Sequence, residues 1–341
     1  YPPCNCISLR IYIFMDDAVG RLLRDALIDK ARQGVKIRLL YDDVGSWKVK
    51  NRFFRDMVKE GIEVYPFGEV KFAALTRRVN YRNHRKLVIV DGQLGYIGGM
   101  NIAERYYKGF SWGGWRDTHI RIEGMAVNAL QTSFFVDWHY ASRMLVDEPV
   151  YFPKVERKGD TDMQIVTSYP MGEWKTIMQG LLQVISQSRR YLYIQTPYFM
   201  PTEPILMALR NAALAGVDVR IIVPLRGDSL LADLASHSYY KEVMTAGVKI
   251  YQYESGYLHA KMILSDDNFV TIGSTNMDFR SFEQNFEINA FIYDPDVVET
   301  MKQIFLADQQ SSLRVIPADW QNRPLWKRCL ESLVRLLSPL L

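Results

Sequence analysis

The sequence predicts an α/β protein made of two tandem, similar domains, each a largely parallel mixed sheet flanked by helices, with the active site at the domain interface. Two observations lead to this prediction. Short apolar strands alternate with amphipathic stretches of about 10 to 16 residues, a pattern typical of α/β layers. The same series of landmarks also occurs twice along the 341 residues, which indicates a duplicated unit.

Each unit begins with an amphipathic stretch that ends at a glycine and leads into an apolar strand. Val19 to Gln33 precedes Gly34-Val-Lys-Ile-Arg-Leu-Leu-Tyr41, and Pro204 to Ala215 precedes Gly216-Val-Asp-Val-Arg-Ile-Ile-Val223. A glycine at this point ends a helix because it tolerates the left-handed backbone. A second pair of strands follows in both units, at residues 61–65 and 247–251.

The two units join in the polar stretch Asp147 to Asp160, which precedes a strand at Met163 to Thr167. We therefore expect one domain over residues 1–150 and a second over 151–341. The second domain closes with Leu325 to Leu341, where apolar residues at helical spacing predict an amphipathic helix.

Composition bounds the class of protein. Hydrophobic residues make up 48% and charged residues 23%, which is typical of a globular chain and excludes a disordered one. The net charge of +4 suits an anionic partner such as phospholipid or nucleic acid.

The cysteines predict neither a disulfide framework nor a zinc site. There are three, Cys4, Cys6 and Cys329, so one must stay unpaired, and a reducing compartment is expected. No apolar run reaches the roughly 18 residues that span a bilayer, and the start lacks the features of a signal peptide. The chain opens almost at once with an apolar strand from Leu9, which indicates a missing upstream segment.

The candidate chemistry lies in a block that occurs once in each half. His84-Arg-Lys86 is followed by Asp91, and His259-Ala-Lys261 by Asp266. Imidazole is a competent nucleophile and proton carrier near neutral pH, and an ammonium group neutralises phosphate oxygens. If these residues lie in a strand, each His projects on the same face as its Lys, and the Asp points the other way. We therefore expect Asp91 and Asp266 to bind the backbone of their own turns.

Each block ends in a glycine turn that carries an asparagine. Gly98 and Gly273 fall 14 residues after their histidines, and Asn101 and Asn276 fall 17 residues after them. Amide and hydroxyl donors at these turns stabilise the charge of a phosphate, so we predict phosphate binding by three residues: Asn101, Ser274 and Asn276.

A carboxylate follows each asparagine on a strand-like segment, Asp117 in the first half and Glu287 in the second. A carboxylate that accepts from one ring nitrogen of a His makes the other nitrogen a better nucleophile. Which carboxylate orients which histidine stays open. These groups supply the charge stabilisation themselves, so we expect no cofactor and no metal.

Two segments present only in the first half are predicted to rim the site. They are Lys71 to Arg78 and Tyr106 to Trp115, both rich in aromatic and basic residues beside the motif.

The duplicated His-x-Lys-x4-Asp followed by Gly-x-x-Asn resembles the signature of the phospholipase D superfamily. Wider stretches are similar to the bacterial cardiolipin synthase family: Leu39 to Gly45, Arg82 to Lys86, Trp115 to His119, Ile194 to Phe199, Gly273 to Phe282 and Glu331 to Leu341. The resemblance covers nearly the whole chain from Ile11.

This resemblance implies a phosphatidyltransferase that moves a phosphatidyl group from one phosphatidylglycerol to another through a phosphatidyl-histidine, giving cardiolipin and glycerol. It implies two catalytic sets: His84, Lys86 and Asp91, with His259, Lys261 and Asp266. The motif alone leaves either histidine as the nucleophile, and the resemblance favours His84. It also implies an anionic membrane surface as partner, at the bacterial inner membrane with the catalytic part facing the cytoplasm, and N-terminal membrane helices that this chain lacks.

Two alternatives stay open. A phospholipase D or nuclease would use water or another alcohol on the same scaffold. Clustered aromatic segments and an amphipathic tail favour a lipid interface, so no nucleic-acid partner is expected. A binding module without activity is disfavoured because both His/Lys pairs are intact.

Overall fold

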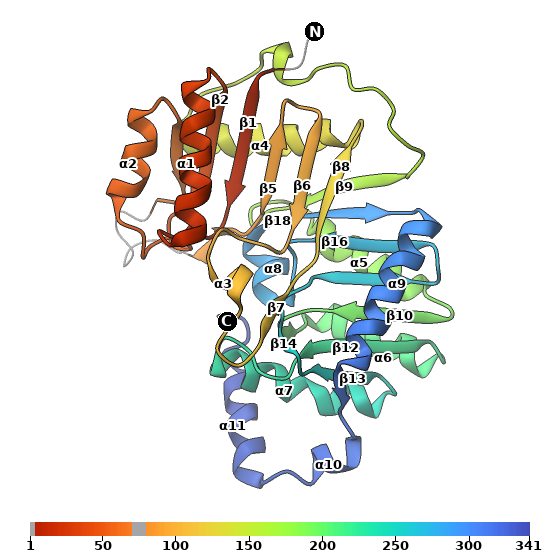
Figure 1. Ribbon diagram of the computed structural model, residues 1–341. Coiled ribbons are helices and arrows are strands. Elements are labelled where there is room, and N and C mark those ends of the chain that lie inside the picture. Colours follow the sequence, from red (N-terminus) through yellow and green to blue (C-terminus); the bar gives the residue numbers. More distant parts are fainter. Residues whose placement is uncertain (1–3, 70–79) are drawn as a thin grey trace.

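The computed structural model describes residues 4–69 and 80–341, which form two α/β halves (Figure 1). The sheet of the first half has the order β3-β2-β1-β5-β6-β8. Its strands are β1 (Cys6–Ile11), β2 (Lys36–Asp42), β3 (Glu63–Phe67), β5 (Leu87–Val90), β6 (Leu94–Gly98) and β8 (His119–Glu123). Its helices are α1 (Ala18–Arg32), α2 (Asn51–Lys59), the short α3 (Arg105–Lys108) and α4 (Ala126–Ser142).

The larger sheet belongs to the second half and has the order β19-β13-β12-β10-β15-β16-β18-β4, with β9 also paired to β18. Its strands are β9 (Met163–Ser168), β10 (Tyr191–Gln195), β12 (Asp218–Pro224), β13 (Lys249–Tyr253), β15 (Met262–Ser265), β16 (Phe269–Gly273), β18 (Asn285–Ile292), β19 (Ser312–Arg314) and β4 (Arg82–Asn83) from the first half. Two short pairs stand apart, β11 (Phe199–Met200) with β17 (Met277–Asp278), and β14 (Gly256–Leu258) with β7 (Gly114–Arg116).

Seven helices are described in the second half. They are α5 (Thr176–Gln187), α6 (Glu203–Leu214), α7 (Leu230–Thr245), α8 (Phe279–Glu283), α9 (Pro295–Gln310), α10 (Pro317–Gln321) and α11 (Leu325–Arg335). A 3-10 turn, η2 (Pro149–Tyr151), lies in the connection between the halves. The predicted domain boundary near residue 150 stays a prediction. The two halves are interlocked, because β4 and β7 of the first half pair with β18 and β14 of the second.

Local sequence explains where the helices begin and end. Asp17 caps α1 by accepting from the backbone N–H of Gly20, and Gly34 follows the helix with a φ of 87°. Ser229 caps α7 and Asp294 caps α9 in the same way. The helices predicted over 19–33 and 204–215 therefore agree with α1 and α6 to within a residue at each end.

The mixed α/β class is confirmed, but fewer strand pairs are parallel than expected. In the first sheet only β1–β2 and β2–β3 are parallel, and β1–β5, β5–β6 and β6–β8 are antiparallel. The reason is the tight turn after the motif, where Asp91 and Gly92 both have positive φ, so that β6 returns beside β5 as a hairpin.

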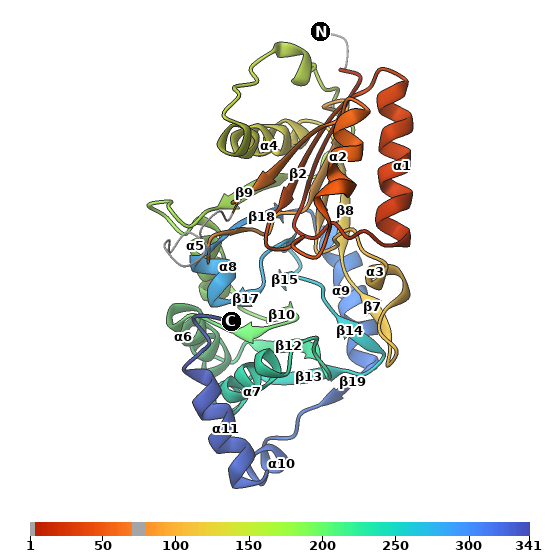
Figure 2. The same ribbon diagram turned by 90° about the vertical axis from the view of Figure 1, so that its left-hand side faces the viewer.

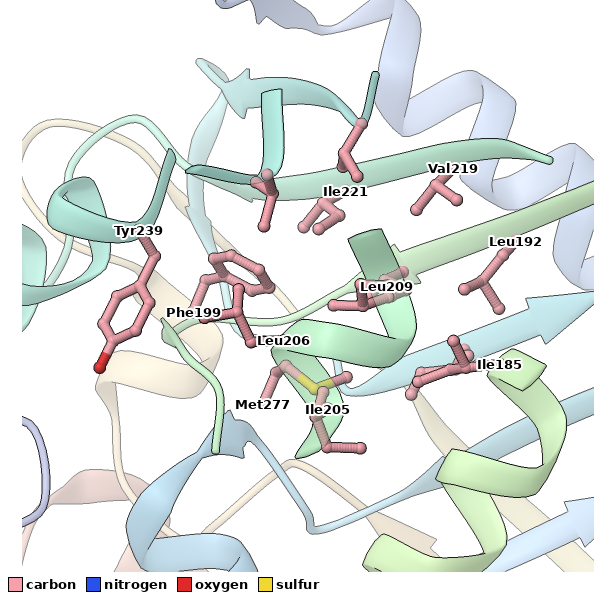
Figure 3. Packing of buried hydrophobic residues seen from close by; sticks show 14 of the residues in the cluster. Ile185, Leu192, Phe199, Ile205, Leu206, Leu209, Val219, Ile221, Tyr239 and Met277 are labelled. Atoms are coloured by element: carbon pink, nitrogen blue, oxygen red, sulfur yellow. The ribbon is translucent and has the colours of Figure 1, made fainter. Parts of the chain in front are cut away.

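Three apolar clusters hold the layers together. One lies between the first sheet and α1 and α2, and another between the second sheet and α5, α6 and α7. Figure 3 shows the latter, with Leu206 and Leu209 of α6 packed toward Val219 and Ile221 of β12. The third combines residues of both halves, including Trp138 on α4 and Phe305 on α9, so the halves share a core. Figure 2 shows the two sheets on either side of this junction.

The cysteine prediction was wrong in one respect, because Cys4 and Cys6 form a disulfide. An odd count leaves one cysteine unpaired but permits one bridge, and residues two apart in an extended segment face the same side. Cys329 is free and exposed. Within 4–69 and 80–341, no helix is both long and apolar enough to cross a membrane.

Candidate active site

The site is a cavity of about 290 Å³ at the junction of the two halves. Both motif histidines line it, although their side chains are nearly buried. The segments that carry them are extended but end just before β5 and β15, so neither His-x-Lys lies within a strand as the parity argument assumed. Instead, the N–H of His84 donates to Phe286 O at 3.0 Å and the N–H of His259 donates to Arg116 O at 2.7 Å.

These two hydrogen bonds continue short parallel strand pairs that cross between the halves. β4, directly before His84, pairs with the start of β18, and β14, directly before His259, pairs with β7. At the second crossing the backbones approach so closely that a Cβ on Gly256 would lie 2.1 Å from Gly114 O. Each half therefore fixes the histidine of the other half through its own backbone.

The same crossings supply each histidine with a carboxylate from the opposite half. His84 Nδ1 lies 3.0 Å from Glu287 Oε1, and His259 Nδ1 lies 2.7 Å from Asp117 Oδ2. An ionised carboxylate can only accept hydrogen bonds, so the ring nitrogen facing it, Nδ1, must carry the proton. The lone pair of Nε2 is then free. Both histidines thus present an unprotonated Nε2 to the cavity.

Burial is the main influence on the charges of these groups. The pKa of His84 falls to about 4 and that of His259 to about 3. Burial makes the largest contribution to this shift, Lys86 and Lys261 add to it, and the paired carboxylates oppose it. Burial alone would raise the pKa of Glu287, but His84 and Lys86 hold it below its ordinary value. The imidazoles are therefore neutral and the carboxylate charged near pH 7.

The two lysines lie behind the histidines. Lys86 Nζ donates to His84 O, and Lys261 Nζ donates to His259 O at 2.5 Å. Burial lowers the pKa of both, to about 8 for Lys261, against the opposing effect of the nearby carboxylates. A phosphate anion in the cavity would favour the charged ammonium form of each.

Both turn asparagines line the cavity. Asn101 Nδ2 donates to Tyr106 Oη at 2.6 Å, and Asn276 Nδ2 donates to Asp278 Oδ2 at 3.0 Å. Each amide nitrogen carries two hydrogens, so one donor of each stays available. Their role in phosphate binding stays a prediction.

Ser274 lies in its glycine turn but does not line the cavity. Its hydroxyl donates to Glu287 Oε2 and accepts from the backbone N–H of Ile288, and its side chain is fully buried outside the cavity. It holds the carboxylate of the His84 pair, and its predicted role in phosphate binding stays a prediction. The matching position in the first half is Gly99, where a Cβ would lie 2.1 Å from Asp117 Oδ1, so the shorter carboxylate needs a glycine there.

Asp91 and Asp266 also lie outside the cavity. Asp91 Oδ1 accepts from the N–H of Cys6 at 2.9 Å, and Asp266 accepts from three consecutive backbone N–H groups that begin at Arg189. Their membership of the two catalytic sets stays a prediction, and in this structure their carboxylates hold backbone N–H groups. They bind the start of the neighbouring strand, not their own turns, because their positive φ directs the carboxylate across the turn.

Of the two first-half segments predicted to rim the site, one does so. Tyr106 and Trp115 line the cavity, and the Trp115 ring lies 4.9 Å from that of His259. Residues 71–78 lie outside the described residues. Two arginines that line the cavity, Arg105 and Arg280, were not predicted from the sequence. Both stand four residues after a turn asparagine, a repeat that could have identified them.

Among the described residues, Cys4, Cys6 and Asp91 lie close together at the far end of β1 and β5, remote from the cavity. The disulfide between the two cysteines leaves no thiolate there to bind a metal.

Two similar halves that each lend a carboxylate to the other's histidine, around one shared cavity, define a phospholipase D-type enzyme acting on phosphodiesters. The family model described as "Cardiolipin synthase, PLD-like domain" matches residues 6–112 and 181–309. The chain therefore belongs to the cardiolipin synthase family of PLD-like proteins.

Curated relatives agree with this family, and a solved structure agrees with the fold. The chain is 44% identical over 338 residues to the major cardiolipin synthase ClsA of Bacillus subtilis, covering 98% of the chain and 70% of that protein. It is 42% identical to a cardiolipin synthase of Geobacillus kaustophilus, covering 98% of the chain and 67% of that protein. Its fold matches phosphatidylserine synthase of Haemophilus influenzae with a TM-score of 0.72 at 15% identity, over 99% of the chain and 91% of that structure.

Proposed function

We propose that this protein is a phosphatidyltransferase that makes cardiolipin and glycerol from two molecules of phosphatidylglycerol. The observation that carries the proposal is the pair of neutral histidines, each tied to a carboxylate of the opposite half, in one cavity. The curated relatives that carry the name cardiolipin synthase support the choice of substrate. A lipid substrate agrees with an aromatic wall around the cavity.

In the first step the Nε2 lone pair of His84 attacks the phosphorus of the donor lipid. The bond from phosphorus to the glycerol oxygen breaks, and His259, protonated at Nε2 in the substrate complex, gives its proton to the departing oxygen. Lys86 and Lys261 neutralise the phosphate oxygens. Glu287 stabilises the positive charge that His84 acquires on bonding to phosphorus.

In the second step the acceptor replaces glycerol. Its headgroup hydroxyl gives a proton to His259 and attacks the phosphorus, and the bond between phosphorus and His84 breaks. The proton balance requires that His259 be charged at the start. Burial opposes this in the empty cavity, whereas a bound phosphodiester anion would raise its pKa.

Substrate delivery favours a membrane surface. Helix α11 packs on α7, and Val334 is buried, but much of its apolar face is exposed, with Leu325, Trp326, Leu333 and Leu336 each between 64% and 75% accessible. Lys327 and Arg328 adjoin this face, a composition suited to an anionic leaflet. We propose that the helix docks on the bacterial inner membrane from the cytoplasmic side.

The test is incubation with labelled phosphatidylglycerol vesicles. Cardiolipin and glycerol are expected as products; accumulation of phosphatidic acid would instead indicate a hydrolase, and consumption of single-stranded DNA a nuclease. His259→Ala should trap an acid-labile phosphatidyl adduct, and His84→Ala should trap none. An adduct on the His259 peptide of the unsubstituted enzyme would reverse the two roles.

A further inference from the structure

Two arginines, Arg105 and Arg280, line the cavity in addition to the motif residues. The motif lysines lie behind the histidines and donate to their backbone oxygens, so the arginines are the cations of the cavity lining itself. Neither arginine has an acidic ion-pair partner among residues 4–69 and 80–341. Half-buried charge without a partner is costly, so such groups commonly serve a ligand.

The two arginines differ in what already holds them. Arg105 lies over the rings of Tyr106 and Trp115, at 5.5 and 5.8 Å from the ring centroids. Arg280, on the first turn of α8, makes no side-chain hydrogen bond or ion pair within the described part of the chain. Of the two, Arg280 is therefore the arginine whose guanidinium group is held by neither an aromatic ring nor a hydrogen bond within the described residues.

The carboxylates that line the cavity do not neutralise Arg280. Asp278 caps α8 by accepting from Ser281 N at 2.7 Å and also accepts from Asn276 at 3.0 Å. Asp228 accepts from the Tyr198 hydroxyl at 2.7 Å. Both are thus already engaged by donors of the protein.

We propose that Arg280 binds a second, non-reacting phosphate, the phosphodiester of the lipid that acts as acceptor. The inference rests on the proposed synthase reaction, in which the acceptor is itself an anionic phospholipid. The attacking hydroxyl of its glycerol headgroup is five bonds from its own phosphorus, a reach of roughly 6 Å. Its phosphate must therefore enter the same cavity as the reacting phosphate, where a fork of guanidinium donors suits it.

Two soluble acceptors isolate this contact. Glycerol and glycerophosphoglycerol, the deacylated headgroup of phosphatidylglycerol, offer the same attacking glycerol, but only the second adds a phosphate. With phosphatidylglycerol vesicles as donor, each acceptor would carry a radiolabel, because transfer to glycerol regenerates phosphatidylglycerol. The kcat/KM for each acceptor would be measured from the label that enters lipid. The unsubstituted enzyme should prefer glycerophosphoglycerol. Arg280→Gln should lower kcat/KM for that acceptor about 10- to 100-fold and leave the value for glycerol within about threefold.

Two further variants make the test specific. Arg280→Lys keeps the charge without the fork and should retain part of the preference. Arg105→Gln is the matched control, because it removes a second cavity arginine that is already held by the aromatic wall; it should affect both acceptors alike.

Three results would overturn the proposal. They are an equal loss for both acceptors in Arg280→Gln, an unchanged preference in that variant, and a selective loss in Arg105→Gln instead. An unsubstituted enzyme that transfers to neither acceptor and only hydrolyses the donor would refute the synthase function itself, and the acceptor site with it.

Discussion

Acid should destabilise this protein through the same histidines that are proposed to do its chemistry. A neutral imidazole in the native state is what makes His84 Nε2 a nucleophile, and burial enforces it by lowering the pKa to about 4. In the unfolded chain the same ring titrates near 6.5. Because the native pKa is the lower one, this group contributes full stability above about pH 6.5 and loses it as the pH falls toward 4.

The size of the effect follows from the two pKa values. At pH 4.5 the unfolded ring is almost fully protonated, while most native rings stay neutral. Between pH 7.5 and 4.5 the unfolded ring takes up almost one proton more than the native ring over almost two pH units. By linkage, this lowers the free energy of unfolding by about 2.5 kcal/mol. His84→Asn keeps a donor beside Glu287 but cannot take up the proton. Between pH 7.5 and 4.5 the unsubstituted protein should therefore lose about 2.5 kcal/mol more than this variant.

Urea unfolding followed by tryptophan fluorescence at a series of pH values measures this difference. His139→Asn, at an exposed position, is the control and should show the acid sensitivity of the unsubstituted protein. Parallel stability curves for His84→Asn and the unsubstituted protein would show that the ring is not held neutral, and the argument for its readiness as a nucleophile would fail.

Four further predictions test the remaining assignments. Glu287→Gln should slow adduct formation about 10²- to 10⁴-fold in single-turnover glycerol release, because the charge formed on the ring loses its partner; a change below threefold contradicts this. Asp266→Ala should lower the unfolding free energy by about 2 kcal/mol in denaturant titrations while the folded enzyme stays active, since its carboxylate holds only backbone N–H groups. Inactivity at unchanged stability would argue for a chemical role. Prolonged chelation should leave transfer intact; loss that one divalent ion restores at the catalytic step counts against metal independence. Replacing Trp326 and Leu336 together by Glu should reduce sedimentation with anionic vesicles several-fold, and equal binding would exclude the tail as a membrane contact.

The repeat made much of the fold predictable. Landmarks that return in the same order identify two similar units, and the local signals that stop a helix, such as Gly34 after α1, depend on neighbouring residues alone. Whether neighbouring strands run parallel or antiparallel was harder to predict, because a hairpin and a crossover connection both begin with a turn. The turn at Asp91 and Gly92 reverses the chain, and this depends on their backbone conformation.

The sequence indicated which residues near the motif are functional candidates, but not which groups their side chains contact. Ser274 belongs to the glycine turn as expected, yet its hydroxyl meets Glu287, a residue placed by the next strand. Arg105 and Arg280 carry a repeat signal in the sequence, but only the cavity shows that they face the same space as the histidines.

The sequence by itself determined the duplication, the two His/Lys pairs and the family, because these depend on residue identity and spacing. The tertiary structure alone decided that Glu287 serves His84 and Asp117 serves His259. The members of these pairs are 203 and 142 residues apart. No local pattern couples positions so distant, since their meeting depends on how the halves pack and on the strand pairs β4–β18 and β7–β14 that cross between them.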